Sequence, residues 1–219
     1  MLFELKKTFP DYYRYYGRRI AKRLSPSIND IFIKNFKNFS LDAEVLKNLN
    51  SDQYQSLTLN SKFKKNIIEI GFGDGKHLFG LAQANKDTHF IGCEVFINGL
   101  GKALKKIVEN NLTNISLCGL NCLYLLENIK DSSIDKIFII NPDPWEKKRH
   151  FKRRLINKEF IALMYKKIKN GGKVIVTTDS SSYFLSILEI IKSEEIDFEE
   201  TFQKMLDKGD ELYDISKYQ

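Results

Sequence analysis

The stretch IIEIGFGDGKHLFGLA (residues 67–82) decides the fold. A run of β-prone apolar residues leads into three glycines at alternate positions, Gly71, Gly73 and Gly75, and a helical pattern follows. Glu69 places a carboxylate inside the apolar run, two residues before the first glycine. Glycines allow a tight turn and let a ligand lie close to the backbone. The stretch therefore predicts a strand, a ligand-binding loop and a helix, with a nucleotide-type ligand at the loop.

Length and charge restrict the class of protein. A chain of 219 residues suits one domain, or one domain with an arm. The 35 Lys and Arg residues exceed the 28 Asp and Glu residues, and the net charge of +7 favours an anionic partner. Charges interrupt the N-terminal residues before a signal-peptide core develops, and no stretch approaches the roughly 18 apolar residues of a spanning helix. We expect a cytoplasmic protein without a membrane partner.

The cysteines and histidines give no sign of a metal site. Cys93, Cys118 and Cys122 are odd in number and form no CxxC pair, so a reduced, intracellular protein is the simplest interpretation. The three histidines are scattered along the sequence, and no Cys/His cluster indicates zinc. We expect no metal.

Short β-type runs alternate with helical patterns from residue 66 onward. Runs such as KIFII and KVIVTT are apolar throughout, as in strands that are buried on both faces. The alternation predicts an α/β, Rossmann-like fold with a mostly parallel sheet, helices on both faces, and ligands at the carboxyl ends of the strands. The expected strands are Ile67–Gly71, Phe90–Val95, Ile115–Cys118, Lys136–Ile140 and Lys173–Thr178. The expected helices are Lys76–Ala84, Gly99–Asn110, Cys122–Ile129, Leu155–Lys169 and Ser181–Lys192.

Residues 1–60 differ from the rest of the chain. They begin with many aromatic and basic residues and continue with a polar stretch of weak periodicity. We expect an N-terminal arm over residues 1–60, packed on or next to a main domain over residues 61–219.

The glycine spacing distinguishes between cofactors. The loop reads GxGxG, whereas the dinucleotide fingerprint is GxGxxG. GxGxG with an acid two residues before the first glycine is typical of the S-adenosylmethionine loop of methyltransferases. Glu94 ends the next expected strand, where a carboxylate accepts both ribose hydroxyls of an adenosine and repels a 2′-phosphate. The alternative is a plain strand-to-helix turn, with Glu69 as a solvated edge residue.

Three further polar residues follow expected strands. Asn121 suits contact with an adenine, and it equally suits a helix N-cap. In NPDPW (residues 141–145), the two prolines restrict the backbone on both sides of Asp143, which makes it a candidate catalytic acid on a stiff turn. Trp145 beside it either offers a flat surface or packs in the core. Asp179 ends the fifth strand as an N-cap or a substrate contact.

Two basic clusters indicate a nucleic-acid partner. The run KKRHFKRR (residues 147–154) is basic at nearly every position, and DYYRYYGRRIAKR (residues 11–23) interleaves Arg and Lys with tyrosines. Basic clusters with aromatic residues are the usual footprint of nucleic acid, where phosphates supply affinity and aromatic rings stack on bases. The alternative is a solvated charged face. The position of the first run beside the expected ligand site favours RNA binding.

The strings EIGFGDG, GCEV, PDPWEKKRHFKRRL and TTD, in this order and spacing, resemble the bacterial tRNA (guanine-N7)-methyltransferases over about residues 66–192. The string YYGRR is similar to the basic arm of that family. The resemblance implies a class I methyltransferase fold, S-adenosylmethionine as cofactor, and methyl transfer to N7 of a guanine in the variable loop of tRNA. The chain departs from the family at Asn141, where Phe is usual, and at Glu199–Phe202, which does not reproduce a C-terminal Thr-x-Tyr/Phe-Glu motif.

The expected site residues follow from the loop and from the resemblance. Asp143 takes the position of the catalytic acid, and Lys147 and Asp179 take those of the residues that contact the guanosine. The expected cofactor-binding residues are Glu69, Gly71, Gly73, Glu94, Asn121 and Asp143. We expect a monomer or a weak homodimer.

Other functions stay open at this point. One is a methyltransferase that acts on a protein or a small molecule, although the basic run argues against small molecules. A second is a non-catalytic RNA-binding protein of the same fold. A nicotinamide dehydrogenase ranks third because of the glycine spacing.

Overall fold

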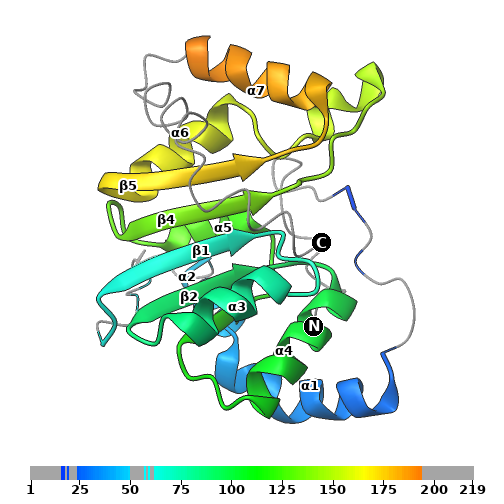
Figure 1. The fold of residues 1–219 in the computed structure, drawn as a ribbon, viewed down its shortest axis with the longest axis vertical. Helices are drawn as coiled ribbons and strands as arrows, with labels where there is room; N and C mark the ends of the chain where they lie inside the picture. The colour runs from blue at the N-terminus through cyan, green and yellow to red at the C-terminus, as the bar shows by residue number, and fades with distance from the viewer. Residues whose placement is uncertain are drawn as a thin grey trace.

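The computed structural model describes residues 16–17, 19, 24–49, 57, 59 and 62–193. Its centre is a sheet of five parallel strands in the order β3-β2-β1-β4-β5, drawn with all arrowheads toward one edge in Figure 1. The chain first runs outward from β1 to β3 and then returns to the other side of β1, so the strand order reverses between β1 and β4. The strands are β1 (Lys65–Ile70), β2 (Thr88–Cys93), β3 (Ile115–Cys118), β4 (Ile134–Ile140) and β5 (Ile168–Thr177).

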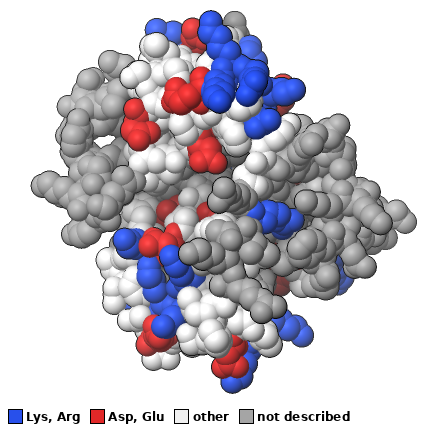
Figure 2. All heavy atoms as spheres, turned by 90° about the vertical axis from the view of Figure 1, so that its right-hand side faces the viewer, with Lys and Arg blue, Asp and Glu red and all other residues white. Residues whose placement is uncertain are grey.

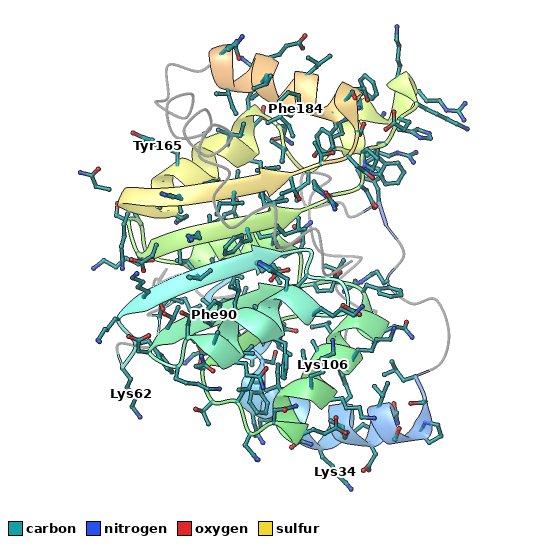
Figure 3. All side chains as sticks on the ribbon, in the orientation of Figure 1. Lys34, Lys62, Phe90, Lys106, Tyr165 and Phe184 are labelled. Carbon is teal, nitrogen blue, oxygen red and sulfur yellow. The ribbon has the colours of Figure 1, made fainter. Side chains whose placement is uncertain are left out.

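Helices cover both faces of the sheet, as the alternation of β and helical patterns predicts (Figure 1). Two apolar cores result, one on each face. The core against α3 and α4 contains Phe90 of β2, which Figure 3 labels, and the other contains the next residue, Ile91. The helices are α3 (Lys76–Ala84), α4 (Ile97–Glu109), α5 (Cys122–Asn128), the 3-10 helix η3 (Lys148–Arg153), α6 (Lys158–Lys167) and α7 (Ser181–Ser193).

Two helices precede the sheet, in a segment where weak periodicity gave no helix in the sequence analysis. They are α1 (Pro26–Phe39) and α2 (Asp42–Leu49). Ser25 caps α1 by accepting a hydrogen bond from the Ile28 N–H at 3.4 Å, and a proline follows at the first helical position. α1 packs on α4, and Val45 of α2 is fully buried in the core beside α5. The described part of residues 24–49 therefore packs on the domain.

The boundary between α6 and β5 differs from the expected one. The helix was expected over Leu155–Lys169, but it begins after Asn157, whose side chain accepts a hydrogen bond from the Phe160 N–H at 2.9 Å. It ends at Lys167, which is buried and bonded at 2.7 Å to both the Ile129 carbonyl and Asp131. Ile129 and Asp131 lie 38 and 36 residues before Lys167 in the chain, so no local sequence pattern indicates this end of α6. Within the described segments, no helix is long and apolar enough to cross a bilayer.

A buried histidine makes the fold sensitive to acid, and we predict a loss of stability between about pH 6.5 and about pH 4. His89 is 4% exposed, stacks on Phe63, and has its ring nitrogens beside Asn66 and Ser116. Burial lowers the pKa of His89 from 6.5 to about 4. The unfolded chain therefore takes up this proton first, which removes about 3 kcal/mol as the pH falls through that window.

His89→Gln removes this titration and tests the prediction. Urea denaturation gives the free energies of unfolding of the parent and the variant at about pH 7 and about pH 4. Between these two pH values the parent should lose about 3 kcal/mol more than the variant, because only the parent carries the titrating imidazole. A difference that does not change with pH would contradict the assignment.

Candidate active site

A cavity of about 640 Å³ lies at the carboxyl ends of the strands, where the strand order reverses. Parallel α/β sheets bind ligands at such a point. Gly71 follows β1, Glu94 follows β2, Asn121 follows β3 and Asp143 follows β4, and all four line the cavity. The topology thus brings together four of the residues that the sequence analysis assigned to the cofactor.

Glu94 fixes the glycine loop. Its carboxylate accepts hydrogen bonds at 2.9 Å from the Gly73 N–H and from the Phe96 N–H. Burial raises the pKa of Glu94, and the hydrogen bonds from backbone N–H groups oppose that rise. Gly73 does not line the cavity itself, but its φ of 58° aims the N–H at this carboxylate. Gly73 and Glu94, both expected to bind the cofactor, are therefore joined by a hydrogen bond.

One face of α4 lies against the same loop. A Cβ on Gly99 would collide with the carbonyl of Gly73, and one on Gly75 would lie 2.8 Å from Cβ of Ala103. Lys106 completes the contact by donating from Nζ to the Asp74 carbonyl at 3.0 Å. The positions 99, 103 and 106 share one helix face. Gly99 and Ala103 are small, and this allows α4 to lie close to the glycine loop. The glycine motif alone does not indicate this contact.

Glu69 is not in the lining of the cavity. It is 3% exposed, and its Oε2 lies 2.9 Å from Nδ1 of His77 in the first turn of α3. Burial raises the pKa of Glu69, and the contact with His77 opposes the rise. The solvated-edge alternative is therefore wrong, because this carboxylate is buried between the central strand and α3.

Of the two roles expected for Asn121, the helix N-cap is present, and the adenine contact stays a prediction. Its side chain caps α5 by accepting a hydrogen bond from the Leu123 N–H at 3.0 Å, and it also lines the cavity. The buried thiols of Cys93 and Cys122 complete this part of the lining. Burial raises the pKa of Cys122 to about 12, so its thiol stays protonated.

The NPDPW corner bends through two unusual backbone conformations. Asn141 has φ of 45° and Trp145 has φ of 47°, a left-handed region that costs about 1–2 kcal/mol for residues other than glycine. The Asn141 N–H donates to the carbonyl and to Oγ1 of Thr177, at 3.1 and 3.2 Å. Between these two turns, Asp143 is exposed and lines the cavity. Hydrogen bonds to β5 and two left-handed residues thus define the backbone on both sides of this acid.

Arg154 stabilises the NPDPW corner. Although it belongs to the basic run, it is 5% exposed and lies between the rings of Phe151 and Tyr183, with its guanidinium carbon 3.8 and 4.7 Å from their centres. It donates from Nε to the Pro144 carbonyl at 2.8 Å and from Nη2 to Oγ of Ser182 at 2.9 Å. The expectation that the run is a continuous nucleic-acid surface is corrected here, because Arg154 is a structural residue.

Glu146 adds a second connection between the corner and α7. Its Oε1 accepts a hydrogen bond from Oγ of Ser180 at 2.6 Å, and its Oε2 accepts one from Oγ of Ser182 at 3.3 Å. Ser180 directly follows Asp179, so the ends of β4 and β5 are joined beside the cavity. Glu146 directly follows NPDPW, and this acidic residue is the sequence feature that could have indicated the contact.

Aromatic and basic side chains form the outer wall of the cavity. The guanidinium of Arg153 lies 5.0 Å from the centre of the Trp145 ring and 5.1 Å from that of Tyr16. The two rings meet edge to face at 6.5 Å, and His150 meets Trp145 in the same way at 5.7 Å. Tyr16 belongs to the predicted arm, so part of that arm lies at the cavity. The sequence analysis assigned the aromatic residues of the cluster over residues 11–23, Tyr16 among them, to base stacking and did not place this one at the cavity.

The remaining predicted residues lie outside the cavity lining. Lys147 and Asp179 are exposed; Lys147 lies two residues after the NPDPW corner, and Asp179 lies two residues after the end of β5. Among the basic residues of the cluster over residues 11–23, Arg19 lies within the described part of the chain and the others do not, and the segment Glu199–Phe202 also lies outside it. In the part of the chain that the structure describes, no group of three or more His, Cys, Asp or Glu residues is arranged to hold a metal ion.

Comparisons with known proteins agree with this geometry. A family model with the description "Putative methyltransferase" matches residues 64–219. The tRNA (guanine-N(7)-)-methyltransferase of Wolbachia pipientis wMel is 34% identical over 192 residues, which cover 88% of this chain and 79% of that protein. The corresponding enzyme of Neisseria meningitidis is 41% identical over 139 residues, which cover 62% of this chain and 58% of that protein.

A longer relative matches over a similar region. The "Bifunctional methyltransferase" of Rickettsia prowazekii is 36% identical over 179 residues, which cover 82% of this chain and 32% of that protein. This chain therefore spans about a third of the length of that relative.

Arg154 should matter for stability far more than its neighbours in the basic run, and we predict that Arg154→Ala lowers the free energy of unfolding by roughly 2–4 kcal/mol. The change removes hydrogen bonds from a buried cation and its contact with two rings. Lys148→Ala, at an exposed position of the same run, is the matched control and should change stability by less than about 0.5 kcal/mol. Equal effects in urea denaturation would show that Arg154 does not hold the corner.

Proposed function

The chain belongs to the family of bacterial tRNA (guanine-N7)-methyltransferases, and from this premise we propose that it transfers a methyl group from S-adenosylmethionine to N7 of a guanine in tRNA. The observation that carries the proposal is the convergence of Glu94, Asn121 and Asp143 on one cavity at the strand-order reversal. We further propose the variable loop as the place of the guanine and the cytoplasm as the compartment, with the enzyme acting as a monomer or a weak homodimer.

The donor set of the cavity fits S-adenosylmethionine. Each oxygen of Glu94 accepts one backbone hydrogen bond and keeps a lone pair for a ribose hydroxyl. Gly71 has φ of 72° and leaves the loop backbone open to the ligand, since a Cβ there would meet nothing within 4 Å. Asn121 would contact the adenine. Glu69 and Gly73 would support this site through His77 and Glu94, and not by direct contact.

The cavity also protects the cofactor from a side reaction. S-adenosylmethionine supplies an electrophilic methyl group on a sulfonium, and a thiolate nearby would compete for it. Cys93 and Cys122 line the cavity, but a hydrogen bond with the Cys118 thiol and burial raise the pKa of Cys93, and burial raises the pKa of Cys122. Both stay neutral thiols, which are poor nucleophiles.

Positioning carries most of the proposed rate. N7 of guanine has a lone pair and no proton, so its attack on the methyl carbon needs no base. The protein has to hold N7 in line with the methyl group and the sulfur. Positive charge then moves from the sulfur to the purine, and the carboxylate of Asp143 on its stiff corner would stabilise that charge. It could instead accept a hydrogen bond from the N1–H or amino edge of guanine, since a carboxylate only accepts.

The wider surface supports tRNA as the substrate. The exposed members of the basic run lie beside the cavity, and Tyr16 and Trp145 offer ring surfaces at its outer wall. We propose that Lys147 and Asp179 contact the guanosine, as the family resemblance implies. Residues 61–219 would be the catalytic domain and residues 1–60 the arm that guides tRNA.

Methylation by the purified protein tests the whole proposal. The protein is incubated with labelled S-adenosylmethionine and mixed tRNA, the tRNA is digested, and the nucleosides are identified by mass spectrometry. We expect label in 7-methylguanosine. Label in another nucleoside, or none in RNA under conditions where the cofactor binds, would overturn the proposed substrate or the proposed reaction.

Glu94 should serve the cofactor and not the tRNA. We predict that Glu94→Gln weakens S-adenosylmethionine binding by about 1.5–3 kcal/mol, or roughly ten- to a hundredfold, because a charge-assisted hydrogen bond to the ribose is lost. Calorimetry gives the cofactor affinity, and a filter-binding assay gives the tRNA affinity, which should change little. Unchanged cofactor affinity in the folded variant would remove Glu94 from the site.

Asp143 should act in the transition state. We predict that Asp143→Asn, which keeps the shape of the corner, lowers the single-turnover rate at saturating cofactor and tRNA by about a hundredfold. A defect that excess cofactor overcomes would instead make Asp143 a binding residue. Asp179→Asn, measured beside it, should raise the tRNA concentration needed for saturation more than it lowers the saturated rate.

A further inference from the structure

A second group of basic side chains flanks the cavity, on the glycine-loop side. Lys76 is the first residue of α3, and Lys102 and Lys106 lie on α4. Figure 3 labels Lys106 on α4, in front of the sheet. Figure 2 faces the carboxyl edge of the sheet and shows Lys and Arg side chains in an upper and a lower group, with Asp and Glu side chains among them and a further Lys or Arg side chain near the middle. The three lysines are defined here as the lysine patch.

The spacing of two lysines on α4 would be unfavourable if their face of the helix only contacted solvent. Lys102 and Lys106 are four residues apart, and like charges at that spacing destabilise a helix by roughly 0.2–0.5 kcal/mol. Two other lysines have an acid at the same spacing. Lys105 pairs with Glu109 at 3.6 Å, and Lys34 of α1 pairs with Asp30 at 2.9 Å.

The lysine patch holds more positive charge than its acids balance. Asp74 is the carboxylate there, and its Oδ2 lies 3.8 Å from Nζ of Lys76. Within the described residues, no ion pair joins Lys102 to a carboxylate. Burial lowers the pKa of Lys106, and the charges of Lys76 and Lys102 lower it further, against the opposing effect of Asp74. Three like charges that crowd in this way favour an anion.

The cavity between the two basic surfaces carries charges of both signs. Glu94 and Asp143 line it beside Lys152 and Arg153, so its two carboxylates repel the phosphates of a nucleotide strand that brings a base into it, while the basic residues attract them. The backbone of such a strand is therefore best held away from the carboxylates, on the flanks. The exposed basic residues of the run, Lys147, Lys148, Arg149 and Lys152, lie on one flank beyond β4, and the lysine patch lies on the other beside β1 and β2.

We propose that the lysine patch binds phosphates of the tRNA substrate, on the side of the cavity opposite the basic run. This inference rests on the proposed function. Two basic surfaces would hold the strand on both sides of the guanine, and the carboxylates of Glu94 and Asp143 between them would keep the phosphates away from the cofactor while the base enters. The lysines would add affinity without base specificity, as phosphate contacts do.

The double variant Lys76→Gln, Lys102→Gln tests the inference. Lys106 stays unchanged because it bonds to the glycine loop. The dissociation constant for tRNA is measured over a range of salt concentrations. We expect the slope of log affinity against log salt to become shallower by about 1–2, with binding weakened several-fold at low salt, since each lost phosphate contact contributes roughly 0.7–0.9 to the slope. Cofactor affinity and the rate at saturating tRNA should stay within about twofold of the parent.

The matched control is Lys86→Gln, Lys130→Gln, which removes the same charge from exposed loops before β2 and β4, at the opposite edge of the sheet. A tRNA salt slope that is the same in both double variants would overturn the inference. So would an equal loss of cofactor affinity and tRNA affinity, because the patch would then act through the glycine loop. If the parent methylates tRNA while the patch variant matches the control, only this inference fails. If the parent does not bind tRNA, it fails together with the proposed function.

Discussion

The carboxylate of Glu94 joins the parts of the molecule on which the rest of the site depends. It sits at the end of β2 and receives the N–H of Gly73 from the glycine loop and that of Phe96 from the start of α4. The close contact of Gly99 with the same loop is possible because α4 starts at this point. Burial makes the ionised carboxylate costly, and two backbone donors offset part of that cost. The loop, the helix and the cofactor side of the cavity therefore share one hydrogen-bonded group.

The other side of the cavity is built on a different principle. The NPDPW corner bends through two left-handed residues, and its shape is maintained by contacts with distant elements: Thr177 of β5, Arg154 below it and the serines before and within α7. Strained backbone persists only where the surroundings over-determine it. The placement of Asp143 thus depends on side chains from β5, α7 and the basic run as well as on its own two prolines.

The sequence predicts the sheet well because its signals are local. Apolar runs alternate with helical ones, and polar residues stand at strand ends, so the cavity and four of its lining residues follow from topology alone. What it misses depends on burial. Arg154 looks like its exposed neighbours in the basic run, yet it lies between two rings. Glu69 reads as a ligand contact, yet it pairs with His77. Tyr16 contacts Trp145, which lies about 130 residues further along the chain, and no local sequence pattern predicts a contact across that separation.

The strand order also has a consequence for the order of folding. β1 pairs with β2, which follows it closely, and with β4, and the register joins Ile67 to Lys136 and Ile70 to Ile139 across about 70 residues. Closing so long a loop is slower and less favourable than forming the β1–α3–β2 unit. The ligand cavity lies at the β1–β4 junction, so we expect the nascent chain to complete it late, after the Arg154 segment has left the ribosome. Pulsed hydrogen exchange during refolding would then find β2 amides protected before those of β4, and the reverse order would contradict this view.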